Sequence, residues 1–260
     1  MNFLKGKPAG RKFTVRISIV LVLAIIAGIF ISYVGDYYRT DCDAVETFAP
    51  MNTVSSERID DGILVFRPEN ATKGLILYPG GKVEYTAYQP LMAACAQQNV
   101  LCILTEMPLN LAVLDVNAAD GIQEQYPEIE KWYIGGHSLG GSMAASYAAK
   151  HAGDLEGLLL LAAYSTADLN GTGLDVLSVY GSEDGVLNMS KYDEYRQNLP
   201  EDTTTEMVIE GGNHAGFGDY GAQEGDGEAA VNGEKQREVT AETFMEILRG
   251  GETRTETQEE

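Results

Sequence analysis

One stretch of the sequence constrains the fold more than any other. An apolar run, Trp132–Gly135, leads into Gly136-x-Ser138-x-Gly140, and a run of small residues, Ser142–Ala149, follows. This order predicts a strand, a tight turn and a helix, with the serine at the turn. Glycines suit the flanking positions because a Cβ there would collide with the neighbouring strand and helix. The serine hydroxyl is then expected to project from the top of a sheet, where helical N–H groups favour negative charge.

The G-x-S-x-G motif is not specific by itself. In a chain with 29 glycines, composition alone produces the motif about one time in eight. A glycine-rich turn with a capping serine is the alternative interpretation. A nucleophilic serine needs a base and an orienting carboxylate, so the rest of the sequence has to supply them.

The chain has three histidines as candidate bases. His137 lies inside the turn, and His151 closes the helix that follows it, where it suits the helix dipole. His214 lies in a glycine-rich loop after the apolar run Met207–Ile209, from which a side chain can reach over a cleft. His214 is therefore the predicted base, with an ordinary loop histidine as the alternative.

The predicted orienting carboxylate is Asp184, with Glu183 as the fallback. Both follow a likely strand that ends near Tyr180. The order Ser138, Asp184, His214 along the chain is that of α/β-hydrolases and differs from the orders in chymotrypsin and subtilisin. A helix-capping aspartate is the alternative for Asp184.

An oxyanion hole would complete such a site. The apolar run 74–78 leads into a glycine pair, and glycines let the backbone approach a substrate oxygen closely. One N–H group is expected from Leu139, directly after the serine. The other is expected from Gly81, with Lys82 as the next choice.

The chain resembles the α/β-hydrolase superfamily, specifically the small lid-less "alpha/beta hydrolase fold-5" type related to dienelactone hydrolase-like proteins. The resemblance implies an α/β-hydrolase three-layer sandwich with a mostly parallel central sheet, and it implies serine ester hydrolysis. Dienelactone hydrolases typically carry a cysteine nucleophile where this chain has Ser138, so lactone specificity is not implied. The segments that carry the resemblance are 75–91, 107–122, 133–148, 176–187 and 209–229.

These residues predict a serine hydrolase that cleaves a carboxylic ester or related acyl bond in a small molecule, with no metal or organic cofactor. Acyl transfer to an acceptor other than water and carbon–carbon bond hydrolysis use the same triad and stay open. A non-catalytic binding protein on a hydrolase scaffold is the third alternative. The oligomeric state is left open.

The N-terminus predicts a membrane anchor. Residues 1–16 hold five basic residues and no acidic ones, and residues 17–34 hold no charge. About 20 apolar residues span a bilayer, and positive charge before the span predicts a cytoplasmic N-terminus. We therefore expect a single-pass signal-anchor helix in the cell membrane, with the catalytic domain extracytoplasmic. A cleaved signal peptide and a buried core helix are the alternatives.

The rest of the chain is strongly acidic. The first 35 residues hold 5 of the 18 basic residues and none of the 39 acidic ones, so the remainder carries 13 basic residues and a net charge of −26. Such a domain is repelled by nucleic acid. Its predicted parts are a connector at 35–60 with one short helix, a catalytic domain at 61–250 and a flexible acidic tail at 251–260.

Strands and helices alternate along the predicted domain, as in parallel βαβ units. About a dozen residues separate the strands that end near Ala162 and begin near Leu174, which leaves no room for a lid. The acidic, glycine-rich loop 218–236 is expected near the site mouth, where Tyr220 or Gln223 could contact substrate. The predicted strands are 63–66, 74–78, 100–105, 131–135, 157–162, 174–180 and 205–209, and the predicted helices are 86–98, 117–126, 139–151, 189–199 and 239–248.

Overall fold

The computed structural model of this 260-residue chain describes residues 9–41, 54–59 and 62–258. The chain divides into two units, residues 1–37 and 38–260. Residues 1–8 of the predicted basic segment 1–16 and residues 42–53 and 60 of the predicted connector 35–60 lie outside the described residues.

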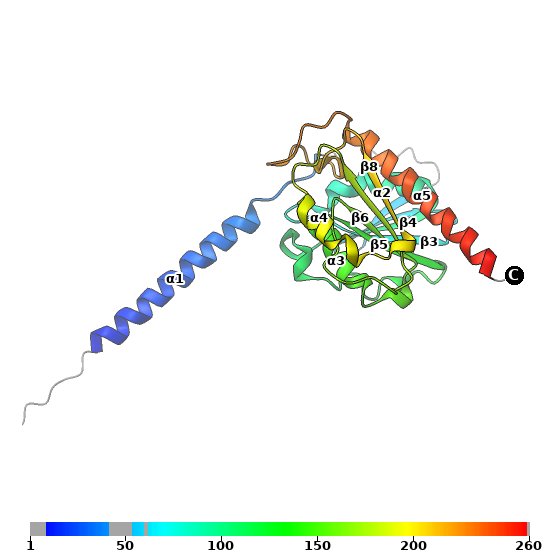
Figure 1. Ribbon diagram of the computed structural model, residues 1–260. Coiled ribbons are helices and arrows are strands. Elements are labelled where there is room, and N and C mark those ends of the chain that lie inside the picture. Colours follow the sequence, from blue (N-terminus) through cyan, green and yellow to red (C-terminus); the bar gives the residue numbers. More distant parts are fainter. Residues whose placement is uncertain (1–8, 42–53, 60–61, 259–260) are drawn as a thin grey trace, which may run out of the picture. The chain divides into compact units, whose positions relative to one another are not determined.

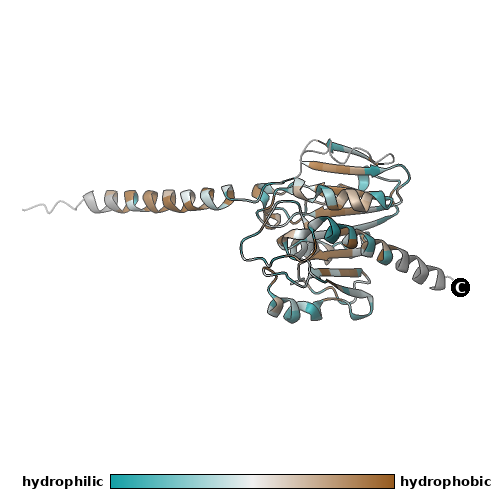
Figure 2. Ribbon diagram, turned by 90° about the horizontal axis from the view of Figure 1, so that it is seen from above, coloured by the Kyte–Doolittle hydropathy of each residue, from teal (hydrophilic) through white to brown (hydrophobic). Residues whose placement is uncertain are grey.

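The first unit contains helix α1 (Ala9–Gly35). Its segment Val15–Gly35 has a mean hydropathy of 2.8, and its large apolar side chains are exposed. Figure 2 shows hydrophobic residues along the length of this helix. Among the described residues it is the one helix long and apolar enough to cross a membrane.

The second unit is built on an eight-stranded sheet in the order β1-β2-β4-β3-β5-β6-β7-β8 (Figure 1). The strands from β4 to β8 in that order are parallel, while β2 is antiparallel to both β4 and β1. A mostly parallel sheet confirms the predicted fold class. The strands are β1 (Val54–Ile59), β2 (Ile63–Pro68), β3 (Lys73–Tyr78), β4 (Val100–Thr105), β5 (Lys131–His137), β6 (Gly157–Leu161), β7 (Asp175–Gly181) and β8 (Thr204–Ile209).

Helices cover both faces of the sheet, which gives three layers. Because side chains alternate along a strand, Leu75 and Leu77 of β3 pack into one core and Ile76 into the other. Helices α2 and α5 close the first core, and α3 closes the second. The helices of this unit are α2 (Gln89–Gln97), α3 (Leu139–Ala148), α4 (Met189–Tyr195) and α5 (Gly233–Gln258).

The strand order reverses at β3, whose two neighbours are β4 and β5. Helix α2 follows β3 on one face of the sheet, and α3 follows β5 on the other. In open parallel sheets, ligands bind at the carboxyl ends of the strands on either side of such a reversal. The turns at Gly80–Gly81 and Ser138 both lie there.

The helix predicted over 117–126 is wrong. Those residues form turns and one short 3-10 helix at Gln123–Gln125. Gly121 has a positive φ of 76°, which interrupts a right-handed helix. The N–H of Ala119 donates to the buried hydroxyl of Tyr78, so a tertiary contact fixes the backbone of this segment.

Two other segments differ from expectation. Val54–Ile59, inside the predicted connector, forms β1 and pairs with β2. Helix α5 begins at Gly233 and continues to Gln258, through most of the segment expected to be a tail. Residues 162–174, between β6 and β7, contain no helix, in keeping with the expected lack of a lid.

Candidate active site

Ser138 lies in the sharp turn that the sequence predicts. Its φ of 52° and ψ of −119° are unusual for a residue with a side chain, and they place it between β5 and α3. The turn depends on glycine because the backbones nearly touch. A Cβ on Gly136 would lie 2.4 Å from the carbonyl carbon of Gly140, and one on Gly140 would lie 2.2 Å from the oxygen of Pro79.

His214 and Asp184 form a buried pair at the ends of β8 and β7. The imidazole Nδ1 lies 2.9 Å from Asp184 Oδ2 and 3.1 Å from Oδ1, and both side chains are 1% exposed. Asp184 Oδ1 also accepts hydrogen bonds from the backbone N–H groups of Val186 and Leu187, at 2.9 and 2.8 Å. The fallback residue Glu183 instead accepts from Ser182, at 3.1 Å.

Ser138 and His214 line one hollow of about 250 Å³. The Nε2 atom of His214 is buried and has no hydrogen-bond partner within the described part of the chain. In sites without a bound substrate, the hydrogen bond between a catalytic serine and its histidine is often long, and it tightens when substrate binds. The hollow is also lined by Leu139, Ser142, Ala162, Ala163, Tyr164, Val186, Leu187 and Asn188.

The two candidate oxyanion donors lie side by side. We call residues 79–82, after β3, the glycine loop. A Cβ on Gly81 would lie 2.9 Å from Leu139 Cδ2, so this loop lies against the start of α3. Leu139 is the first residue of α3, and the first N–H groups of a helix have no carbonyl partner within it. The N–H of Lys82 donates to Asn110 O at 2.7 Å, which leaves Gly81 as the better loop candidate.

A buried tyrosine connects the glycine loop to the turn, and sequence reasoning missed it. The hydroxyl of Tyr88 accepts a hydrogen bond from Gly80 N–H at 3.0 Å and lies 2.7 Å from His137 Nδ1. Burial lowers the pKa of His137 well below its ordinary value, and the neighbouring His214 acts in the same direction. The ring of His137 is therefore held neutral beside the Tyr88 hydroxyl.

Residues 38–41, which we call the strap, contact two loops that flank the candidate site. Tyr38 donates its N–H to Lys82 O at 2.8 Å, and its carbonyl accepts from Glu84 N at 2.9 Å. On the other side, Asp41 N donates to Asp219 O at 2.8 Å, and the Tyr38 hydroxyl accepts from Glu224 N at 3.1 Å. The strap thus joins the glycine loop to the loop after His214.

Tyr220 and Gln223, which were expected to contact substrate, bond to each other at 2.9 Å. Tyr220 is buried against Tyr38 and Tyr88, and neither it nor Gln223 lines the hollow beside Ser138. The same loop contributes Asp226, whose carboxylate contacts the backbone of His214 at 3.1 Å. No sequence motif marks Asp226, because its partners Gly185, His214 and Ala215 lie in other loops.

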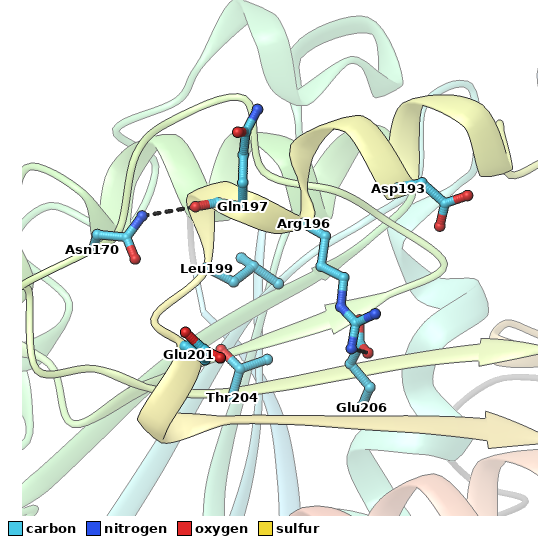
Figure 3. Close-up of a pocket in the computed structure, with 8 residues that line it drawn as sticks. All are labelled: Asn170, Asp193, Arg196, Gln197, Leu199, Glu201, Thr204 and Glu206. Carbon is cyan, nitrogen blue, oxygen red and sulfur yellow. Dashed lines mark hydrogen bonds and ion pairs between the residues drawn. The ribbon is translucent and has the colours of Figure 1, made fainter.

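A second hollow opens beside α4 and β8 (Figure 3). Its lining is mostly polar, and Arg196 there is paired with Glu206. The side-chain amide of Asn170 donates to Gln197 O at 2.8 Å across its rim, the dashed line in Figure 3. None of the candidate catalytic residues lines it. Within the described residues, no set of three or more His, Cys, Asp or Glu side chains is arranged to hold a metal.

Comparison with family models supports what the geometry suggests. Residues 74–238 match the model of the alpha/beta hydrolase family. The chain belongs to this family. The matched region of this alpha/beta hydrolase runs from β3 into α5 and contains Gly81, Ser138, Asp184 and His214. No curated protein matches the sequence.

Several solved structures are similar to this alpha/beta hydrolase. A dienelactone hydrolase from Anabaena variabilis is 13% identical, with a TM-score of 0.57 over 75% of this chain and 99% of that one. Carboxyl esterase 2 from Tuber melanosporum is 10% identical, with a TM-score of 0.56 over 82% and 91%. Est1E from Butyrivibrio proteoclasticus is 12% identical, with a TM-score of 0.54 over 76% and 100%. At these identities the likeness is one of fold.

Proposed function

We propose that the chain is a serine hydrolase that cleaves small carboxylic esters through Ser138, His214 and Asp184. One observation carries the proposal. His214 is held through Nδ1 by Asp184, while its buried Nε2 has no partner among the described residues and the ring lines the same hollow as Ser138. A histidine held this way has one nitrogen oriented and the other ready to take a proton. The family and its esterase-named structural neighbours agree with this chemistry.

Acylation is the first half of the proposed reaction. Ser138 Oγ attacks the ester carbonyl carbon while its proton passes to His214 Nε2. The N–H groups of Leu139 and Gly81 bind the oxygen that becomes negative. Asp184 holds the ring and stabilises the imidazolium. The C–O bond to the alcohol then breaks, and the alcohol leaves with the proton from Nε2, so Ser138 is left acylated.

Deacylation repeats these steps with water as the nucleophile. His214 takes a proton from water as the oxygen attacks the acyl carbon, and the proton returns to Ser138 Oγ when the bond to the enzyme breaks. A hollow of about 250 Å³ lies below the usual range for ligand pockets, about 300 to 1,000 Å³. We therefore expect short acyl groups as substrates.

The test is hydrolysis of p-nitrophenyl esters, from acetate to decanoate, by the detergent-solubilised full chain. Ser138→Ala is expected to lower kcat by at least about a thousandfold, because no other group can form the acyl-enzyme. Ser146→Ala is the matched control. It removes a hydroxyl from the same helix, α3, where Ser146 Oγ donates to Ser142 O at 2.9 Å, and it should retain activity.

A fluorophosphonate probe separates the remaining outcomes. Hydrolysis that persists in Ser138→Ala would contradict the proposal. Labelling at Ser138 without hydrolysis of any ester would point to a different acyl acceptor or substrate on the same nucleophile. A wild-type chain that neither hydrolyses esters nor reacts with the probe would favour a non-catalytic scaffold.

We also propose that α1 anchors the enzyme as a single-pass membrane helix with the catalytic domain outside the cytoplasm. The length and hydropathy of Val15–Gly35 support a span, and the five basic residues within 5–16, at its N-terminal end, support the orientation.

A further inference from the structure

The carboxylate of Asp226 accepts four backbone hydrogen bonds from three segments. Its Oδ1 accepts from the N–H groups of Gly185 at 3.1 Å, His214 at 3.1 Å and Gly227 at 2.9 Å. Its Oδ2 accepts from Ala215 N–H at 2.8 Å. Hydrogen bonds to an ionised acceptor are stronger than those between neutral groups.

Two of these segments carry the candidate orienting carboxylate, Asp184, and the candidate base, His214. Gly185 directly follows Asp184 at the end of β7, and His214 is itself a donor in the loop after β8. The two loops come from different strands, so the separation of Asp184 from His214 is set by how the loops are held together. Asp226 is bonded to both, which makes it a link between the backbones that carry the pair.

The link is tightly packed. A Cβ on Gly185 would lie 2.4 Å from Gly225 O, and one on Gly227 would lie 1.9 Å from Glu183 O. The side-chain amide of Asn213 adds a bond to Gly227 O at 2.9 Å. We call residues 219–227 the Asp226 loop. With the backbones this close, the Asp226 loop has little freedom to move along the loop that carries Asp184.

The other end of the Asp226 loop is fixed as well. Asp219 O accepts from Asp41 N, and Glu224 N donates to the Tyr38 hydroxyl, so the strap holds the loop from the side of the glycine loop. The loop over 219–227 is therefore anchored at both ends, and Asp226 lies where it meets the loops that carry Asp184 and His214.

We propose that Asp226 is a positioning residue, which fixes the backbone of His214 relative to that of Asp184 and so sets the orientation of the imidazole toward Ser138. Its catalytic consequence rests on the proposed function, whereas its effect on the geometry of His214 does not. The residue acts through His214 and does not line the hollow where substrate would bind.

Kinetics of the full chain in detergent give the first test. Asp226→Asn replaces one acceptor oxygen with an amide that faces a backbone donor. A misplacement of about 1 Å lowers a rate about a hundredfold, so we expect kcat to fall by about tenfold to a hundredfold with KM little changed. Asp226→Glu keeps both oxygens and is expected to regain part of the loss. Glu228→Gln is the matched control, since it removes the same charge from an exposed residue two positions away.

Histidine-selective nitrogen-15 labelling gives the second test without any need for turnover. With three histidines in the chain, the spectrum contains three backbone amide signals, which His137→Asn and His151→Asn assign. In Asp226→Asn the amide of His214 should move upfield and exchange faster with solvent, and the ring Nδ1–H signal should shift. In Glu228→Gln all three should stay in place.

Unchanged His214 signals in Asp226→Asn would overturn the proposal, and so would changed signals accompanied by wild-type kcat. If Asp226→Asn does not fold, Asp226→Glu carries both tests, and wild-type kcat and His214 signals there would overturn the proposal. A failure of the proposed function looks different. The wild-type chain would then neither hydrolyse esters nor react with the fluorophosphonate, while the labelled spectra would still decide the role of Asp226.

Discussion

His137 is a fully buried histidine whose ionisation opposes folding. Burial lowers its pKa well below the ordinary value, and it is 0% exposed. As pH falls through about 6.5, the unfolded chain binds a proton at this position and the folded chain does not. The free energy of unfolding should therefore decrease on acidification, by up to about 1.4 kcal/mol per pH unit from this residue.

His137→Asn tests this contribution, because it removes the titrating ring and keeps a polar side chain beside the Tyr88 hydroxyl. The variant should lose less stability than the wild type as pH is lowered from about 7 to about 5. Urea unfolding of both chains across that range measures the difference. Parallel stability curves would show that His137 does not contribute to the acid sensitivity of the fold.

The individual site residues differ in how well the sequence predicts them. Ser138, Gly81 and Asp184 follow predicted strands within a few residues, so local patterns place them at one edge of the sheet. Tyr88 and Asp226 have no such signal. Tyr88 contacts His137, 49 positions away, and Asp226 contacts Gly185, 41 positions away. These residues come together only in the folded chain.

At the scale of elements, the strap is a segment that local sequence does not reveal. Removing residues 1–41 would delete its hydrogen bonds to the glycine loop and to the Asp226 loop, whereas removing residues 1–35 keeps them. A few backbone bonds contribute about 2 kcal/mol in total. For a unit of this size, that loss lowers Tm by about 4–8 °C.

Thermal unfolding and ester hydrolysis of the two truncated chains measure this effect. We expect the chain that begins at residue 42 to melt earlier and to have lower kcat than the chain that begins at residue 36. The strap is bonded both to the loop that carries Gly81 and to the loop that carries Asp226. Equal Tm and equal kcat would mean that the strap stabilises neither the fold nor the candidate site.

The strands were predicted more accurately than the helix over 117–126. Buried parallel strands are continuous apolar runs such as Val100–Thr105, and their pattern is visible without knowledge of the partners. The segment 117–126 has apolar residues at helical spacing, yet Ala119 is bonded to Tyr78 across 41 residues and Gly121 turns the chain. Tertiary contacts there outweigh local preference.

At the scale of the whole molecule, charge separates the two ends of the chain. The first 35 residues hold five basic residues and no acidic ones. The rest of the chain holds the other 13 basic residues and all 39 acidic ones, a net charge of −26. Basic residues before an apolar span are retained on the cytoplasmic side. The acidic domain is therefore expected on the opposite side.

Fractionation and N-terminal sequencing test this arrangement. The full chain should remain in membranes after alkaline extraction, whereas a chain that begins at residue 36 should be released. Among the described residues, Val15–Gly35 is the one segment with the apolar length needed to span a bilayer. Protease added outside intact cells should digest the domain and leave the N-terminal segment protected. A released domain whose N-terminus begins after residue 34 would identify the segment as a cleaved signal peptide, and a domain protected from external protease would reverse the predicted orientation.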